Sequence, residues 1–186
     1  MESAETLWTA LVEHPLTVRD ATYGVVARAE FEASGTVVLR YVLRGEISRV
    51  RIPSVQSAAR ADGLWRHTCF EAFIRVPGTA AYYEFNFAPS GQWAAYRFDA
   101  YREGMSPVDF ESPPELCMRR FDDRLEVDAV VHWHELIGLR GAPRLLLALS
   151  AVVEEESGTL SYWALKHPAG KPDFHSLDGF VLELAI

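Results

Sequence analysis

Cysteine, basic charge and long apolar runs are all scarce in this sequence, and each shortage excludes a class of protein. Cys69 and Cys117 are the only cysteines among 186 residues, too few for a disulfide framework and not spaced like a metal motif. We expect two buried thiols that act as small hydrophobic side chains, with pairing between them as the alternative. The 18 basic side chains are outnumbered by 26 acidic ones, and the net charge is −8. This charge argues against nucleic acid or an anionic membrane as the partner.

Targeting and membrane segments are also not evident. The first residues, MESAETLWTALVEH, carry acids and lack the basic and then apolar regions of a signal peptide. No run reaches the ~20 apolar residues of a membrane-spanning helix. We therefore expect a cytoplasmic protein with no membrane partner, and the length suits a single domain over residues 1–186.

Short stretches with strand periodicity are plentiful. Apolar and polar residues alternate over 25–31, 36–44 and 124–133, which is typical of half-buried strands. The pairs Ser34-Gly35 and Asp122-Asp123 predict hairpin turns. Further strands are expected over 47–52, 64–76, 81–88, 92–98, 116–121, 145–153, 160–165 and 180–184, with a strand or irregular start over 7–13, one helical turn over 134–139, and long loops over 99–115 and 166–177. About ten short strands predict an all-β fold: a single-domain antiparallel β-sandwich, immunoglobulin-like or jelly-roll-like.

The stretch 64–98 holds three aromatic-rich runs separated by turns at 77–80 and 89–91. Antiparallel pairing around these turns places Glu71 opposite Asn86, and Glu84 opposite both Phe73 and Tyr96. Side-chain alternation then predicts two faces. The first comprises Trp65, His67, Cys69, Glu71, Phe73, Tyr82, Glu84, Asn86, Tyr96 and Phe98. The second, which we expect to be the core, comprises Phe70, Ala72, Ile74, Val76, Tyr83, Phe85, Phe87 and Trp93.

The first of these faces mixes aromatic rings with carboxylates and an amide. Rings stack on the apolar face of a pyranose, while carboxylates and amides pair with its hydroxyls, which cost ~1–3 kcal/mol each when left unpaired. The pattern therefore indicates a sugar site. The alternative is a solvated outer face whose aromatic side chains fill space between strands.

Three runs resemble a known family. They are DGLWRHTCFEAFI (62–74), YEFNFAPSGQWAAYRFDAYREGM (83–105) and YWALKHPAGKPDFHSLDGFVLEL (162–184). They resemble the bacterial DOMON-like proteins, which are similar to family 9 carbohydrate-binding modules and to the DOMON superfamily. The resemblance covers the chain from about Trp8 to its end, and it implies a β-sandwich with a ligand pocket on one concave sheet.

The resemblance also implies a site. Family 9 modules grip a sugar between two tryptophans and bond its hydroxyls with Glu, Asn, Arg and Gln side chains. On this basis we expect a non-catalytic protein that binds a small sugar or sugar derivative. The expected site residues are Trp65 and Trp163 for stacking, Glu71, Glu84 and Asn86 for the hydroxyls, Tyr96 beside Glu84, Lys166, His167 and Asp173 at the rim, and His175 in the same loop. The family's calcium sites find no matching acidic cluster here, so no metal is expected.

Other chemistries remain open. The second DOMON branch binds haem b through a Met and a His, which the resemblance would place at Met105 and His167. Metal ligands could come from the pair His132 and His134. They could also come from the histidines and the aspartate of the 166–177 loop. Apart from the haem alternative, no cofactor is expected.

Two further alternatives use the same face. Glu71 and Glu84 could act as the carboxyl pair of a glycosidase, which needs separations of ~5–9 Å. The family resemblance implies binding rather than catalysis, and the sequence holds neither G-x-S-x-G nor H-E-x-x-H. The other alternative is a protein–protein interaction module that uses the concave face, with an unknown partner.

Overall fold

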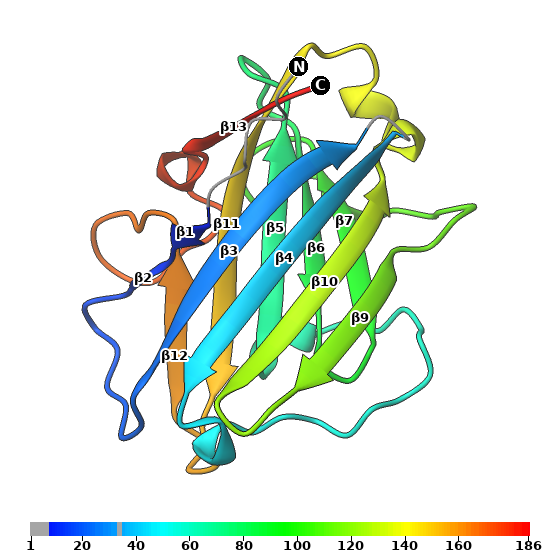
Figure 1. Ribbon diagram of the computed structural model, residues 1–186. Helices are drawn as coiled ribbons and strands as arrows, with labels where there is room; N and C mark the ends of the chain where they lie inside the picture. The colour runs from blue at the N-terminus through cyan, green and yellow to red at the C-terminus, as the bar shows by residue number, and fades with distance from the viewer. Residues whose placement is uncertain (1–7, 33–34) are drawn as a thin grey trace, which may run out of the picture.

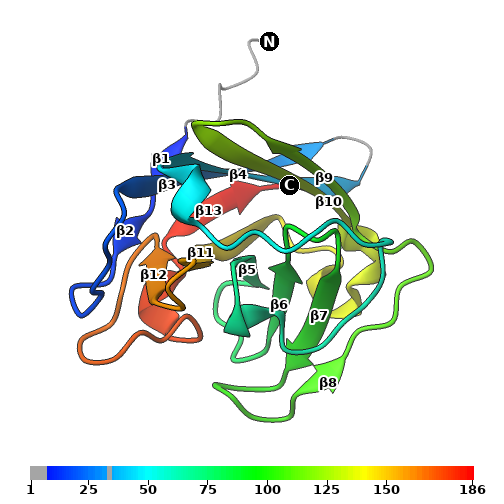
Figure 2. The same cartoon turned by 90° about the horizontal axis from the view of Figure 1, so that it is seen from below.

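Two antiparallel sheets, packed face to face, form the part of the chain that the computed structural model describes, residues 8–32 and 35–186 (Figure 1, Figure 2). One sheet has the strand order β1-β3-β4-β10-β9, and the other has the order β2-β12-β11-β5-β6-β7-β8, with β13 paired to β11. The predicted β-sandwich is confirmed.

The elements run as follows. The strands are β1 Thr9–Ala10, β2 Val12–Glu13, β3 Tyr23–Glu32, β4 Thr36–Gly45, β5 Cys69–Arg75, β6 Tyr82–Phe87, β7 Trp93–Phe98, β8 Ser106–Pro107, β9 Glu115–Arg120, β10 Arg124–His132, β11 Arg144–Glu154, β12 Leu160–Ala164 and β13 Leu182–Ala185. The 3₁₀ helices are η1 Ile47–Arg49, η2 Leu64–Arg66, η3 Trp133–Glu135, η4 Ile137–Leu139 and η5 Leu177–Gly179. No helix in the described ranges is long and apolar enough to cross a membrane.

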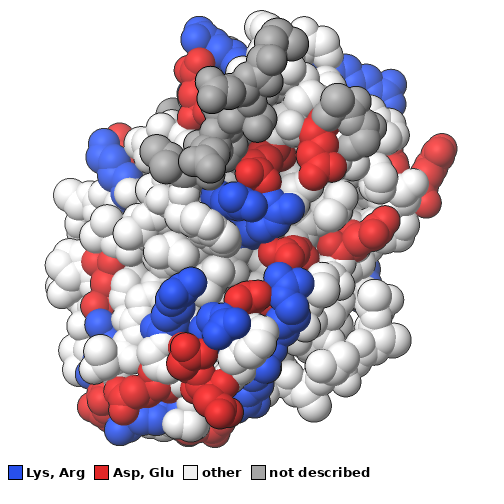
Figure 3. Space-filling view, viewed as in Figure 1, with Lys and Arg blue, Asp and Glu red and all other residues white. Residues whose placement is uncertain are grey.

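The five-stranded sheet presents its outer face to solvent. Strands β3 and β10 alternate buried and partly exposed residues, as period-2 patterning requires. The outward positions carry ion pairs, among them those that Arg40 makes with Glu30 and Asp128. Figure 3 shows acidic and basic side chains interleaved over this face. This face therefore carries paired surface charges, and the candidate site is on the opposite sheet.

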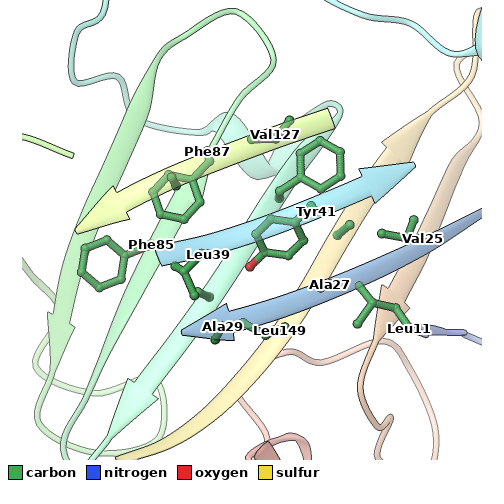
Figure 4. Close-up of a cluster of buried hydrophobic side chains, with 14 of the residues drawn as sticks. Leu11, Val25, Ala27, Ala29, Leu39, Tyr41, Phe85, Phe87, Val127 and Leu149 are labelled. Carbon is green, nitrogen blue, oxygen red and sulfur yellow. The ribbon is translucent and has the colours of Figure 1, made fainter. Parts of the chain in front are cut away.

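The core lies between the sheets. Figure 4 shows Leu39 and Tyr41 from β4 meeting Phe85 and Phe87 from β6, and burying each such side chain contributes about 1.5–3 kcal/mol. The Tyr41 hydroxyl donates a hydrogen bond to the Glu71 carbonyl oxygen at 2.7 Å, which links the two sheets behind the site. The predicted core face is confirmed, with Val76 only partly buried at its edge.

The predicted pairing register of strands β5, β6 and β7, which together form the central meander, is confirmed. Glu71 pairs with Asn86, and Glu84 pairs with Phe73 and with Tyr96. Strands β5, β6 and β7 are buried on both faces, apart from partly exposed residues such as Arg75. The face that carries Glu71, Glu84 and Asn86 together with aromatic rings is therefore covered by other segments of the chain. It is not an open, solvated surface.

Two stretches predicted to be strands throughout begin with a 3₁₀ helix in the structure. Residues 47–52 begin with the helix η1, because Ile47 and Val50 are both buried three residues apart, which is one 3₁₀ turn. The run predicted over 64–76 begins with η2, so β5 starts only at Cys69. Trp65 and His67 therefore lie outside the strand, and the alternation that placed them on its polar face does not apply.

Smaller expectations have mixed outcomes. Leu7 of the expected first stretch and Ser34 of the first turn lie outside the described residues. The single helical turn over 134–139 is instead η3 followed by η4. Cys69 is buried, as predicted, but Cys117 is exposed and both thiols are free, so the expectation for Cys117 and the alternative of pairing are both wrong.

Candidate functional site

A pocket of about 640 Å³ lies on the face of the eight-stranded sheet that points away from the core. Its floor comes from β5, β6 and β7, and its walls come from η2, β12, the segment after β7 and the 166–177 loop. The lining side chains include five aromatic ones (Trp65, Tyr96, Phe98, Tyr162 and Phe174), five charged ones (Arg66, Glu71, Glu84, Arg102 and Asp173) and His175.

Two buried carboxyl groups form the polar part of the floor. The strand register makes Glu71 and Glu84 diagonal neighbours on adjacent strands, an arrangement that places the two residues about 7–8 Å apart, with their Cβ atoms somewhat closer. Asn86 Nδ2 donates a hydrogen bond to Glu84 Oε1 at 2.7 Å. Glu71 is only 3% exposed, and its Oε1 has no hydrogen-bond partner. The sheet thus presents one anchored and one unpartnered carboxyl to the pocket.

Both carboxyl groups resist ionisation. Burial raises the pKa of Glu71 well above its usual value, and the neighbouring Glu84 adds to this effect, while Arg102 opposes it. Burial also raises the pKa of Glu84, opposed by the Asn86 hydrogen bond and by Arg102. Two carboxylates in a shared buried site do not ionise independently. The pair therefore retains a proton to a higher pH than free glutamate does.

His175 is held against the sheet beside these carboxyls. Its Nδ1 is hydrogen-bonded to Tyr82 Oη at 2.8 Å, and its Nε2 lies 3.7 Å from Glu84 Oε2. Burial and the nearby Arg102 lower the pKa of His175 to about 4, although Asp173 opposes the shift. The imidazole is therefore neutral near neutral pH and provides no counter-charge for Glu84.

Asp173 fixes one wall of the pocket. Its carboxylate accepts hydrogen bonds from Tyr101 Oη at 2.6 Å, from Arg102 Nη2 at 2.8 Å and from the His175 backbone N–H at 3.1 Å. Burial alone would raise the pKa of Asp173, but the bonds from Tyr101 and Arg102 outweigh it and lower that pKa. An ionised Asp173 thus ties the 166–177 loop to the segment after β7.

Trp65 stands at the mouth of the pocket. Its side chain is large and apolar, yet the residue is 39% exposed. Its ring contacts Tyr96 edge-on, with centroids 6.1 Å apart, and Tyr96 Oη donates a hydrogen bond to Asp62 Oδ1 at 2.6 Å. The exposed Trp65 ring is therefore supported from one side and available for stacking.

Most of the predicted site residues come together here. Trp65, Glu71, Glu84, Tyr96, Asp173 and His175 line the pocket, and Asn86 lies directly behind Glu84.

Three predicted residues do not belong to the lining, and their placement is corrected. Trp163 is buried in the core between the sheets, where its Nε1 donates a hydrogen bond to Ser161 Oγ at 2.9 Å. Lys166 is exposed and outside the pocket lining. His167 Nε2 is hydrogen-bonded to the Val12 carbonyl oxygen at 2.8 Å, away from the lining.

Sequence reasoning missed several lining residues, above all Tyr162 and Arg102. Strand alternation gives the signal for Tyr162: if Trp163 faces the core, its neighbour must face the pocket. Arg102 has no comparable signal, because its partner Asp173 is 71 positions away in the sequence.

The residues considered for haem or metal do not gather at one centre. Met105 lines the pocket, whereas His167 packs against His14 and is not part of the lining. His132 and His134 have ring centroids 5.7 Å apart, but His134 belongs to η3 and not to the strand. Within the described ranges, no group of three or more His, Cys, Asp or Glu side chains is placed to hold a metal.

Comparison with solved structures shows which proteins share the fold. A candidate carbohydrate-binding protein from Bacteroides uniformis has a TM-score of 0.69 at 15% identity, with 97% of this chain and 86% of that chain covered. A family 9 carbohydrate-binding module from Caldicellulosiruptor kristjanssonii, solved with cellotriose, has a TM-score of 0.56 at 10% identity, with 97% and 82% covered. Its complex with glucose gives a TM-score of 0.55 at 10% identity, with 97% and 84% covered. No protein-family model matches the sequence, and no curated protein matches it either.

Proposed function

We propose that the pocket binds a small carbohydrate or sugar derivative without converting it. One observation supports this above all: Glu71, a buried glutamate whose Oε1 has no hydrogen-bond partner, lines a pocket with aromatic walls. A pyranose matches both features, because its C–H face stacks on rings and its hydroxyls pair with carboxyl and amide groups. The pocket volume of about 640 Å³ also falls within the range typical of small-molecule sites, about 300–1,000 Å³.

The proposed roles follow from position. Trp65 stacks on the sugar ring from the mouth, and Glu71 and Glu84 bond hydroxyls at the floor. Asn86 acts through Glu84, which its amide orients. Because burial raises the pKa of Glu71, its carboxyl keeps a proton to a higher pH than a free glutamate does, and a protonated carboxyl can donate to a hydroxyl oxygen as well as accept from a hydroxyl proton.

Calorimetric titration with glucose and with cellotriose tests the proposal. We expect saturable binding of at least one of them. The variant Trp65→Ala should weaken that binding about tenfold, since a lost aromatic contact is worth roughly 0.5–1.5 kcal/mol beyond its buried area.

A matched control is available in the same chain. Trp8 is 43% exposed, close to the 39% of Trp65, and it lies next to β1 in the other sheet. Trp8→Ala should bind sugar as the wild type does. The proposal would be contradicted if neither glucose nor cellotriose bound at millimolar concentration. Equal sugar affinity in Trp65→Ala and wild type would also contradict it.

Binding without hydrolysis is part of the proposal. Hydrolysis by a carboxyl pair uses one protonated acid and one ionised carboxylate across the scissile bond. Here burial raises the pKa of both Glu71 and Glu84, and the solved structures that share the fold are described as carbohydrate-binding proteins. Incubation with chromogenic glycosides should release no chromophore, and release that depends on both glutamates would establish a hydrolase instead.

A further inference from the structure

The floor of the pocket carries two acids without a cationic partner. Among the described residues, Glu71 makes no ion pair, and the basic atom paired with Glu84 is His175 Nε2 at 3.7 Å. That imidazole is neutral near neutral pH, since its pKa is lowered to about 4. Arg102 also lines the pocket, but its guanidinium is hydrogen-bonded to Asp173. Among the residues that the structure describes, no Lys or Arg forms an ion pair with either carboxyl, and the nearby Arg102 acts on the pair only through its charge.

Two other buried glutamates are treated differently by the fold. Glu154 is paired with Arg51 Nη1 at 2.8 Å and with His67 Nδ1 at 2.8 Å. Glu155 accepts hydrogen bonds from the backbone N–H groups of two residues before β3. Each of these carboxylates therefore has ion-pair or hydrogen-bond partners within the fold. Among the buried glutamates of the described residues, Glu71 is the one with an unpartnered oxygen, and its side chain lines a cavity.

The walls favour a cation as well. Aromatic rings attract an ammonium group within about 6 Å of the ring centroid, by about 0.5–2 kcal/mol depending on desolvation. The side chains of Trp65, Tyr96, Tyr162 and Phe174 surround the same cavity as the two carboxyls. Rings above and carboxylates below together form the environment that a protonated amine prefers over a neutral hydroxyl.

We propose that the sugar bound here carries a protonated amino group, which lies between Glu71 and Glu84. This inference rests on the proposed sugar-binding function and specifies its ligand class as an amino sugar. An ammonium group supplies three hydrogen-bond donors and a full positive charge. It would satisfy Glu71 Oε1 and compensate the repulsion between the two carboxylates.

Proton release follows from this geometry. Among the described residues, the titratable or charged groups that interact with the pair are Tyr41 (from the core side of the sheet), Cys69, Tyr82, Tyr96, Arg102 and His175. Of the remaining charged lining residues, Arg66 is exposed at the mouth and Asp173 is paired with Arg102. The free pair retains a proton because burial raises both pKa values. An incoming ammonium favours two carboxylates, so the glutamic acid proton passes to solvent.

Three probes separate the ammonium group from the sugar ring: glucosamine, glucose and N-acetylglucosamine. The last keeps the nitrogen but removes its charge. At about pH 6, where an amine is protonated, we expect glucosamine to bind about tenfold more tightly than either neutral sugar, because charge-assisted hydrogen bonds are roughly twice as strong as neutral ones. Titration in two buffers of different ionisation enthalpy should show proton release for glucosamine and none for glucose.

Variants locate the effect. Glu71→Gln keeps the shape of the protonated side chain, and it should reduce the ratio of glucosamine to glucose affinity to about one. Glu30→Gln removes one charge from the outer face of the opposite sheet and should leave the ratio unchanged. The proton release of the wild type needs no variant, so it stays informative if Glu71→Gln fails to fold.

The outcomes are distinguishable. If glucose binds and glucosamine binds no tighter, or binds without releasing protons, the amino-sugar inference is overturned while sugar binding stands. If none of the three probes binds, the proposed function falls and the inference falls with it. A glucosamine preference that survives in Glu71→Gln would also overturn the placement of the ammonium group.

Discussion

The phenol oxygen of Tyr82 is hydrogen-bonded to Nδ1 of His175 at 2.8 Å, and it also accepts the backbone N–H of Arg102 at 3.1 Å. One side chain of β6 thus holds two separate segments that wall the pocket, the 166–177 loop and the segment after β7. Because Glu84 extends from the same face of β6, the walls and the carboxyl floor are fixed relative to each other.

Removing this single hydroxyl should loosen the pocket. We expect Tyr82→Phe to weaken sugar binding about fivefold to tenfold and to lower the free energy of unfolding by about 1–2 kcal/mol, since two hydrogen bonds are lost. Tyr83→Phe is the matched control, because Tyr83 Oη accepts a single bond from the Gly138 N–H on the core side. Calorimetry and urea denaturation measure both effects. Equal losses of sugar affinity in the two variants would contradict this role of Tyr82.

His175 predicts a loss of stability in acid. Its pKa is about 4 in the folded state against an ordinary value of 6.5, so the unfolded chain takes up a proton first as the pH falls. The stabilising contribution is fully present above pH 6.5 and is lost as the pH falls towards 4. The difference between the two pKa values, 6.5 and about 4, corresponds to a loss of unfolding free energy on the order of 3 kcal/mol.

An NMR titration of the His175 ring checks this pKa directly, and His175→Gln should have a flatter dependence of unfolding free energy on pH over the same interval. A midpoint near 6.5 for His175 would contradict the effects of burial and of the nearby Arg102 charge on this pKa.

Glu71 predicts the opposite dependence on pH. Its pKa is raised in the folded state above the ordinary 4.5, so its contribution to stability is fully present below about pH 4.5 and is lost as the pH rises through the folded-state pKa. Relative to wild type, Glu71→Gln should therefore gain stability as the pH is raised from about 4 to about 8.

Glu126 gives a control of opposite sign. Its pKa is lowered by hydrogen bonds from Arg124 and Arg119 on the exposed sheet, so Glu126→Gln should lose stability relative to wild type as the pH rises from acid to about 4.5, and the difference should stay constant above that pH. Thermal melts of the three proteins at several pH values provide the comparison. Parallel curves for Glu71→Gln and wild type would show that Glu71 ionises normally.

Trp163 separates a core role from a binding role. Its ring packs in the core near Tyr23, with centroids 5.9 Å apart. Trp163→Ala should cost about 3–5 kcal/mol of folding stability, and the milder Trp163→Phe should cost less. Sugar affinity of folded Trp163→Phe should stay within about twofold of wild type, as measured by calorimetry. A tenfold loss of affinity at unchanged stability would return Trp163 to the site.

The meander could be predicted from the sequence because its constraints are local. The short turns contain Gly78 and Gly91, which adopt φ of +83° and +93°, a region that glycine enters without strain. With the turns fixed, alternation assigns each side chain to a face, and Glu71 and Glu84 fall on the pocket side. The floor of the site was therefore accessible to pairing arithmetic alone.

The walls could not be predicted in the same way. They depend on contacts between segments far apart in the chain, such as Arg102 with Asp173, for which no local periodicity exists. The resemblance to sugar-binding modules suggested Trp163, but a motif match at that level does not decide which of two adjacent aromatic residues faces the pocket. In β12 the pocket-facing residue is Tyr162.

The most direct test of sugar binding at this pocket is a crystal structure of the protein soaked with glucose. The account predicts a pyranose in the cavity, with a hydroxyl within about 3 Å of a Glu71 carboxyl oxygen and the Trp65 ring against its C–H face. A sugar bound elsewhere on the surface, or an empty pocket at saturating glucose, would contradict it.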